Sequence, residues 1–194
     1  MVKGPHKTVQ YRRDREGKTD YHYRRRMLKS GKPRLIARIS LKHVRTQVAD
    51  PDPEGDEILA SAFSKELSEL GWKANTSNTS SAYLVGLLCG YRALEVGVKE
   101  CVLDIDKFVA SPQAKIFAVL KGALDAGLSI SHDEDVLPSE ERIRGEHISN
   151  YAEDLEGEKY ESQFSNYLEN DLEPEDLPEH FKEVKEAIQT QCGV

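Results

Sequence analysis

The sequence has 194 residues, of which 38% are hydrophobic and 31% are charged, with a formal net charge of −7. This length supports one domain of ordinary size with extensions, or at most two small domains. No apolar run approaches the ~20 residues of a membrane span, and no apolar segment follows the N-terminus as it does in a secretory signal. The three cysteines (Cys89, Cys101 and Cys192) lack short spacings, which argues against a disulfide framework and a zinc ribbon. We therefore expect a soluble protein of the cytoplasm.

The charges are distributed unevenly along the chain. Residues 1–50 contain 15 Lys and Arg against 4 Asp and Glu, residues 51–130 contain 7 against 11, and residues 131–194 contain 5 against 19. Such an asymmetry is typical of a basic region that binds a polyanion and an acidic tail. The overall negative charge conceals this basic region.

The N-terminal third begins with a polar, basic segment, residues 1–18, which we expect to be an extended arm without order unless it is bound. Thr19 or Asp20 can cap a helix over residues 21–29, which Gly31 and Pro33 would end. Runs rich in β-branched residues then predict two tightly joined strands, followed by a charged, proline-containing loop, a third strand and a short helix. These elements are expected at residues 34–40, 42–48, 50–57, 58–63 and 64–72, respectively.

The central third reads as alternating helices and strands. We expect a long, largely buried helix at residues 81–97, a central strand at 100–106, and an amphipathic helix at 111–127 with Pro112 in its first turn. A further strand follows at residues 128–131. The acidic C-terminal part predicts surface helices at 138–157 and 178–189, separated by an acidic linker.

This order of elements predicts an α/β fold, a mixed β-sheet covered by helices. A basic extended N-terminal arm and an acidic helical C-terminal extension flank it. The expected division of the chain is 1–32 for the basic arm and helix, 33–130 for the α/β core and 131–194 for the acidic extension.

The predicted helix at residues 21–29 has a cationic side. At 100° per residue, His22, Arg25, Arg26 and Lys29 share one arc. An ordinary solvated helix surface would carry acidic partners for these cations, and almost none are near. The opposite side holds apolar and aromatic residues together with Arg24, which would either reach the polyanion from the helix edge or pair with a carboxylate of the core. The candidates for binding the polyanion on this helix are Tyr21, His22, Tyr23, Arg24, Arg25, Arg26 and Lys29.

Further cations lie on either side of this helix. Arg34 and Arg38 share one face of the first predicted strand, and His43 and Arg45 share one face of the second. Guanidinium groups chelate phosphates, and Tyr and His stack on unpaired bases, which favours RNA over DNA in the absence of a helix-turn-helix or basic zipper. The remaining candidates are Lys3, Lys7, Arg12, Arg13, Arg15, Lys18, Lys32, Arg34, Arg38, Lys42, His43 and Arg45.

Two other functions remain open from the residues. Asp104 and Asp106 follow an apolar strand, where α/β enzymes often place carboxylates, so a metal-dependent RNA-processing enzyme is the alternative. An acidic-tail protein scaffold is the third class. The histidines and cysteines have no metal-ligand spacing, and no glycine motif fits a phosphate loop, so we expect no cofactor, no metal, no catalytic residue and no small-molecule substrate.

Three stretches resemble a known family. "TDYHYRRRMLKSGKPRLIARISLKHVRTQV" (19–48), "SAYLVGLLCGYRALEVGVKECVLDI" (81–105) and "FAVLKGALDAGLSISHDEDVLPSEERIRGEHI" (117–148) are similar, in the same order, to the archaeal and eukaryotic branch of the eighteenth large-subunit ribosomal protein family. The resemblance covers nearly the whole chain.

The resemblance implies a non-enzymatic role in attaching 5S rRNA to 23S rRNA in the central protuberance of the large ribosomal subunit. It also implies an α/β core with a long basic extension lying on RNA. The RNA-facing positions would be the candidates given above, with Lys115 in addition. The acidic tail is similar to the archaeal form, whose extension would contact neighbouring ribosomal proteins.

Overall fold

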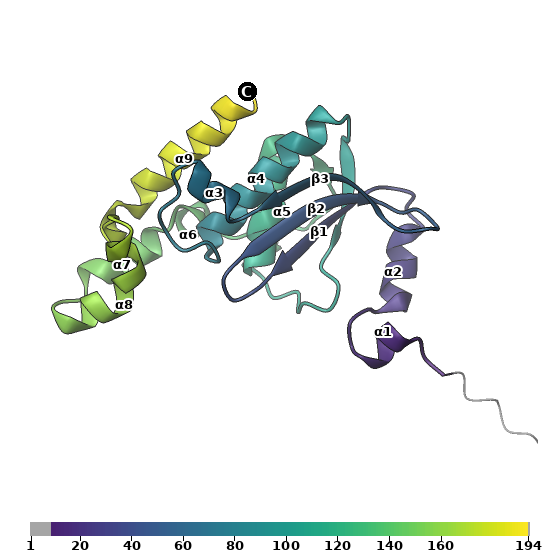
Figure 1. The fold of residues 1–194 in the computed structure, drawn as a ribbon, viewed down its shortest axis with the longest axis horizontal. Coiled ribbons are helices and arrows are strands. Elements are labelled where there is room, and N and C mark those ends of the chain that lie inside the picture. The colour runs from purple at the N-terminus through teal and green to yellow at the C-terminus, as the bar shows by residue number, and fades with distance from the viewer. Residues whose placement is uncertain (1–8, 194) are drawn as a thin grey trace, which may run out of the picture.

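The computed structural model describes residues 9–193. The candidates Lys3 and Lys7, with the first part of the predicted arm, lie outside the described residues. Within them the chain forms a five-stranded mixed sheet in the order β3-β2-β1-β4-β5, with helices packed against it (Figure 1). The prediction of an α/β fold is therefore confirmed.

The sheet combines an antiparallel meander with parallel pairing. Its strands are β1 Arg34–Ile39, β2 Val44–Asp50, β3 Glu57–Phe63, β4 Glu100–Asp104 and β5 Ser129–Ile130. β1 pairs antiparallel with β2 and parallel with β4, and β2 pairs antiparallel with β3. The central strand is thus β1. The strand that the sequence predicted as central, β4, lies between β1 and the two-residue β5.

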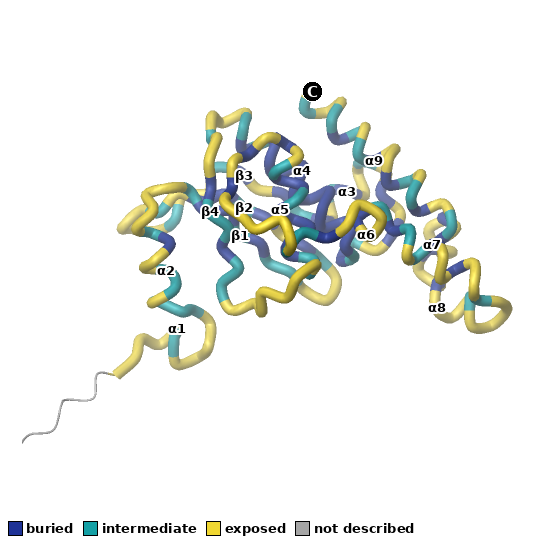
Figure 2. The backbone as a smooth tube through the Cα atoms, turned by 180° about the vertical axis from the view of Figure 1, so that it is seen from behind, coloured by how far each residue is buried: buried dark blue, intermediate teal, exposed yellow. Residues whose placement is uncertain are grey.

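Two long helices cover one face of the sheet. α4 (Thr79–Glu95) and α5 (Lys115–Ala126) pack on each other, and Leu35, Val44 and Val48 of the sheet are completely buried beneath them. Figure 2 shows that buried positions concentrate in this part of the molecule. Asn78 caps α4 by accepting a hydrogen bond from the Ser81 N–H, and Gly127 ends α5 in the left-handed conformation. α5 begins at Lys115, so the expectation that Pro112 lies in its first turn is wrong.

The contact between α4 and α5 depends on glycine. A Cβ atom at Gly122 would lie 2.1 Å from the carbonyl oxygen of Tyr83 and 2.7 Å from the backbone nitrogen of Leu87. A Cβ atom at Gly86 would lie 2.1 Å from the carbonyl oxygen of Val119. Because both obstacles are backbone atoms, no side-chain rotation can make room for a methyl group.

We therefore expect Gly122→Ala to destabilise the protein by about 3 kcal/mol, at the upper end of overpacking costs, despite the better helix propensity of alanine. Urea denaturation measures the change in the free energy of unfolding. Lys121→Ala on the same helix is the control and should cost much less. Equal stability of Gly122→Ala and the wild type would contradict the close helix contact.

Two short helices precede the sheet. α2 spans Tyr21–Leu28, and the side chain of Asp20 caps it by accepting hydrogen bonds from the His22 and Tyr23 N–H groups, as the sequence predicts. α1 spans Arg12–Arg15, one helical turn within the segment expected to be extended. Tyr11 packs against Tyr21, with the ring centroids 5.0 Å apart. That residues 1–18 lack order without RNA stays a prediction.

The C-terminal part packs on the core more closely than the sequence indicated. Its helices are α6 Glu140–Arg144, α7 Glu146–Glu153, α8 Glu158–Glu169 and α9 Leu177–Gln191, and the short helices α3 Glu66–Glu69, η1 Glu134–Val136 and η2 Pro174–Asp176 complete the described elements. The expected acidic linker largely forms α8. The expected surface helix α9 buries Phe181, Val184 and Ile188 in the same apolar cluster as α4.

His180 joins α9 to the loop after α3. Its ring stacks on Trp72, with centroids 5.2 Å apart, and its Nε2 accepts a hydrogen bond from the Lys73 N–H at 3.1 Å. Burial lowers the pKa of His180 below its usual value and outweighs the opposite effect of Glu183. The neutral imidazole is therefore the form that fits the folded protein.

Because the folded-state pKa of His180 is lowered, its contribution to stability is complete above the unfolded pKa of about 6.5 and is lost as the pH falls through the folded value. We expect the urea midpoint to fall between pH 7 and pH 5 by more in the wild type than in His180→Phe, which keeps an aromatic ring but cannot be protonated. The same pH dependence in both proteins would contradict this role.

Candidate RNA interface

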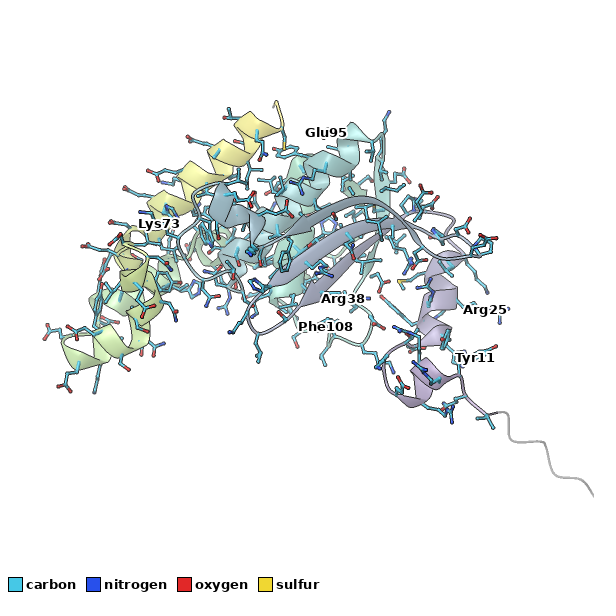
Figure 3. The ribbon with its side chains drawn as sticks, viewed as in Figure 1. Tyr11, Arg25, Arg38, Lys73, Glu95 and Phe108 are labelled. Carbon is cyan, nitrogen blue, oxygen red and sulfur yellow. The ribbon has the colours of Figure 1, made fainter. Side chains whose placement is uncertain are left out.

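The cationic side of α2 faces solvent. His22, Arg25, Arg26 and Lys29 are exposed, whereas Met27 is buried. On the other side, Tyr21, Tyr23, Arg24 and Leu28 are partly buried. The helical wheel therefore predicted correctly which side of α2 faces solvent. In Figure 3, Arg25 extends from α2 on the side away from the sheet. None of Arg25, Arg26 and Lys29 forms an ion pair within residues 9–193.

Arg24 anchors α2 to the core. Its Nη2 lies 2.7 Å from Oδ1 of Asp56, in the loop before β3, so of the two possibilities for Arg24 the structure has the carboxylate pair. Oδ2 of Asp56 lies 2.6 Å from Nη2 of Arg34, and Nη1 of Arg34 donates a hydrogen bond to Oδ2 of Asp104 at 2.7 Å. These four residues, the Arg24–Asp104 network, connect α2, the loop and two strands.

The sequence places Arg34 among the RNA-binding candidates, but in the structure its side chain is buried. Its side chain is only 2% exposed because α2 and the loop before β3 cover this end of the sheet face. Both of its ion-pair partners are protein carboxylates. Arg34 therefore links the loop before β3 to strands β1 and β4, and its side chain is not exposed to a ligand.

Asp56 is ionised under ordinary conditions. Burial raises its pKa, but hydrogen bonds from Arg24 and Arg34 outweigh burial and hold the pKa of Asp56 below its usual 3.8. A lowered carboxyl pKa stabilises the folded state above the unfolded value and ceases to do so as the pH falls through the folded one. The attachment of α2 is therefore intact at neutral pH and weakens only in strong acid.

The sheet face opposite α4 and α5 carries a mixed basic and aromatic surface. Arg38, Arg45 and Phe63 are direct cross-strand neighbours on β1, β2 and β3. The guanidinium of Arg45 lies over the Phe63 ring, 5.3 Å from its centroid, and the His43 ring lies 4.9 Å from the same ring. A shallow hollow of about 390 Å³ lies among these side chains and Gln47. We call Arg38, His43, Arg45, Gln47 and Phe63 the open sheet face.

Sequence reasoning missed Phe63, because its strand carries no cation and reads simply as apolar. Lys107 and Phe108, in the loop after β4, were also missed; both are exposed, Phe108 by 41%. In the view of Figure 3, Phe108 and Arg38 both appear below the sheet, where β1 ends. The pairing of β2 with β3 brings the Phe63 ring beside Arg45.

The other candidates lie outside these two surfaces. Arg13, Arg15 and Lys42 are exposed; Arg13 donates to the Thr19 hydroxyl. Arg12 and Lys18 both pair with Glu16, and Lys32 pairs with Glu100. The ammonium group of Lys115 donates a hydrogen bond to the Ser77 carbonyl at 2.9 Å, next to the α4 cap, so this group already has a partner within the protein.

Asp104 and Asp106 form ion pairs with arginine side chains. Asp104 is buried and pairs with Arg34, and Arg38 reaches Asp106 at 3.5 Å and the Asp104 carbonyl at 3.2 Å. Within residues 9–193, no group of three His, Cys, Asp or Glu side chains could hold a metal ion. Arg34 and Arg38 thus supply the positive charge next to these two carboxylates.

Two comparisons with known proteins point to the same family. The family model described as "Ribosomal large subunit proteins 60S L5, and 50S L18" matches residues 6–100. The chain is 53% identical to the large ribosomal subunit protein uL18 of Methanothermobacter thermautotrophicus over 188 residues, which cover 97% of this chain and 98% of that protein.

The chain is thus a structural constituent of the large ribosomal subunit and not an enzyme. It belongs to the uL18 family, in its archaeal branch. Its place is the cytoplasmic ribosome, as expected. In the part of the chain that the structure describes, no helix is long and apolar enough to cross a membrane.

Proposed function

We propose that this protein binds 5S rRNA and attaches it to 23S rRNA in the central protuberance of the large subunit. The observation that carries the proposal is the row of exposed cations on α2, Arg25, Arg26 and Lys29, none of which has an ion-pair partner within residues 9–193. Arginine and lysine without protein partners are available for phosphates, and such contacts supply most of the affinity for a nucleic acid.

The two surfaces suit different parts of an RNA. The side chains on α2 project from a helix that the Arg24–Asp104 network fixes to the core, which suits the regularly spaced phosphates of an RNA backbone. The open sheet face offers Phe63 between His43 and Arg45, a platform on which unpaired bases can stack. Phosphate contacts would position the RNA, and stacking would favour unpaired nucleotides.

The roles proposed for the three parts of the chain follow the distribution of charge along it. Residues 1–32 are proposed as the RNA-binding arm and helix, 33–130 as the core that supports them, and 131–194 as the acidic extension that meets neighbouring ribosomal proteins. The net −14 of the extension disfavours contact with RNA and favours protein partners.

A competition experiment tests the proposal. The full chain is bound to labelled 5S rRNA in a filter assay and challenged with unlabelled 5S rRNA or unlabelled transfer RNA of similar charge density. We expect 5S rRNA to displace the label at least about a thousandfold more effectively, the lower end of the usual ratio of specific to non-specific binding. Equal displacement by the two RNAs would show that the protein binds RNA only through non-specific electrostatic attraction, and would refute the proposal.

A further inference from the structure

A groove crosses the C-terminal helices at the end of the molecule opposite α2. One hollow of about 620 Å³ lies between the turn that joins β1 to β2 and helices α7 and α8. A second, of about 460 Å³, continues beside α8 and shares Tyr151 and Gln163 with the first. We call the two together the α7–α8 groove; the residues that matter here are Leu41, Ile148, Tyr151, Leu155 and Phe164.

Exposed apolar and aromatic side chains lie among the polar residues that line the groove. Leu41, at the tip of the turn, is 97% exposed, and Tyr151 is 49% exposed. The Tyr151 ring meets the edge of the buried Phe164 ring, with centroids 6.2 Å apart, which gives the groove an aromatic floor. Removing an exposed leucine side chain from water stabilises a complex, and an apolar patch with a polar rim is typical of a docking site.

The surroundings of the groove are strongly negative. Residues 146–176 contain 11 Asp and Glu and a single cation, Lys159. Glu153, Glu158 and Glu161 are exposed, and none of them lies within 4 Å of a cationic nitrogen in the described part of the chain. Glu158 lines the second hollow together with Lys159, and Glu153 and Glu161 belong to the same two helices. Carboxylates without partners at these positions are complementary to lysine and arginine and repel phosphate.

The sign of the charge changes at one end of the groove. An adjoining hollow of about 520 Å³ shares Leu41 and Asn75 with it but is lined by Lys42 and Lys73. Figure 3 places Lys73 at the end of the molecule far from Arg25. A bound cationic segment would therefore lie on α7 and α8 and stop before these two lysines.

We propose that the α7–α8 groove docks a lysine- and arginine-rich segment of another protein. An apolar side chain of that segment rests on Leu41 and Tyr151, and its cations face Glu153, Glu158 and Glu161. This inference rests on the proposed contact of residues 131–194 with neighbouring proteins and specifies where and with what chemistry that contact is made. It does not depend on RNA binding, since the groove and α2 lie at opposite ends of the molecule (Figure 1).

The test uses the full chain and a fluorescein-labelled peptide of alternating arginine and leucine, followed by fluorescence anisotropy. We expect Leu41→Ser/Tyr151→Ser to weaken binding at least about tenfold, and Glu153→Gln/Glu158→Gln/Glu161→Gln to do the same. The matched control, Glu134→Gln/Glu179→Gln/Glu186→Gln, removes the same charge from exposed positions away from the groove and should leave the affinity unchanged. Thermal unfolding of each variant verifies that it is folded.

Three outcomes would overturn the proposal. A control variant that weakens peptide binding as much as the groove variants would show diffuse attraction without a site. Loss of binding to labelled single-stranded RNA in the groove variants would make RNA the occupant. A smaller sedimenting species for Leu41→Ser/Tyr151→Ser than for the wild type would make a second copy of the chain the occupant. Unchanged affinity of these variants for 5S rRNA keeps this test separate from the proposed function.

Discussion

Arg34→Met is expected to lower the free energy of unfolding by about 3–5 kcal/mol, the usual cost of removing one partner from a buried ion pair. Methionine fills a similar volume, so the loss is chiefly electrostatic. Among residues 9–193, Asp104, with a side chain only 4% exposed, would keep as partners Arg38 at 3.7 Å and the Asp106 N–H at 3.0 Å. A carboxylate left in the interior without its closest cation is far less stable than the same group in water.

Urea denaturation of three variants tests this account. Asp104→Leu alone should also be strongly destabilising, because it leaves the guanidinium of Arg34 with Asp56 as its only ion-pair partner among residues 9–193. Arg34→Met/Asp104→Leu removes both charges and should recover much of the loss, since an apolar pair often replaces a buried ion pair at little cost. If the double variant were as unstable as the sum of the single variants, the two side chains would not act as a pair.

The second large effect concerns RNA. Arg25→Ala/Arg26→Ala/Lys29→Ala should raise the Kd for 5S rRNA roughly a hundredfold, since each contact between an exposed cation and a phosphate contributes about 1 kcal/mol. Arg24 is left in place because its pair with Asp56 attaches α2 to the core. The variant should therefore keep the thermal stability of the wild type while losing affinity.

A matched control separates local contacts from overall charge. Lys65, Lys99 and Lys182 are exposed and lie outside the proposed interface, and none forms an ion pair with another described residue. Replacing all three with alanine removes the same charge as the α2 variant. An equal loss of affinity in the control would remove the special role of α2.

The sequence predicts those features that depend on neighbouring residues. The wheel over residues 21–29 separates exposed cations from partly buried aromatics because helical period alone decides which side a residue occupies. The Asp20 cap and the Gly127 helix end follow from equally local chemistry. The residues missed or misplaced are those whose surroundings come from distant parts of the chain.

Arg34 illustrates this limit. By alternation it shares a face with Arg38, which is correct, but only the tertiary structure reveals that α2 and the Asp56 loop cover one end of that face. Phe63 is missed because only the pairing of β2 with β3 brings Arg45 over its ring, and the residues next to Phe63 in the sequence give no sign of this. The acidic segment that forms α8 reads as a linker because its few apolar residues, such as Phe164 and Tyr167, are separated by charges and amides.

The central claim is that unpaired cations of α2 bind the phosphates of 5S rRNA, and the salt dependence of binding tests it most directly. The slope of the logarithm of the association constant against the logarithm of salt concentration counts the phosphates neutralised, at roughly 0.7–0.9 per contact. We predict a steep slope for the full chain and a slope shallower by about 2–3 for Arg25→Ala/Arg26→Ala/Lys29→Ala. Identical slopes for the two proteins would contradict the account.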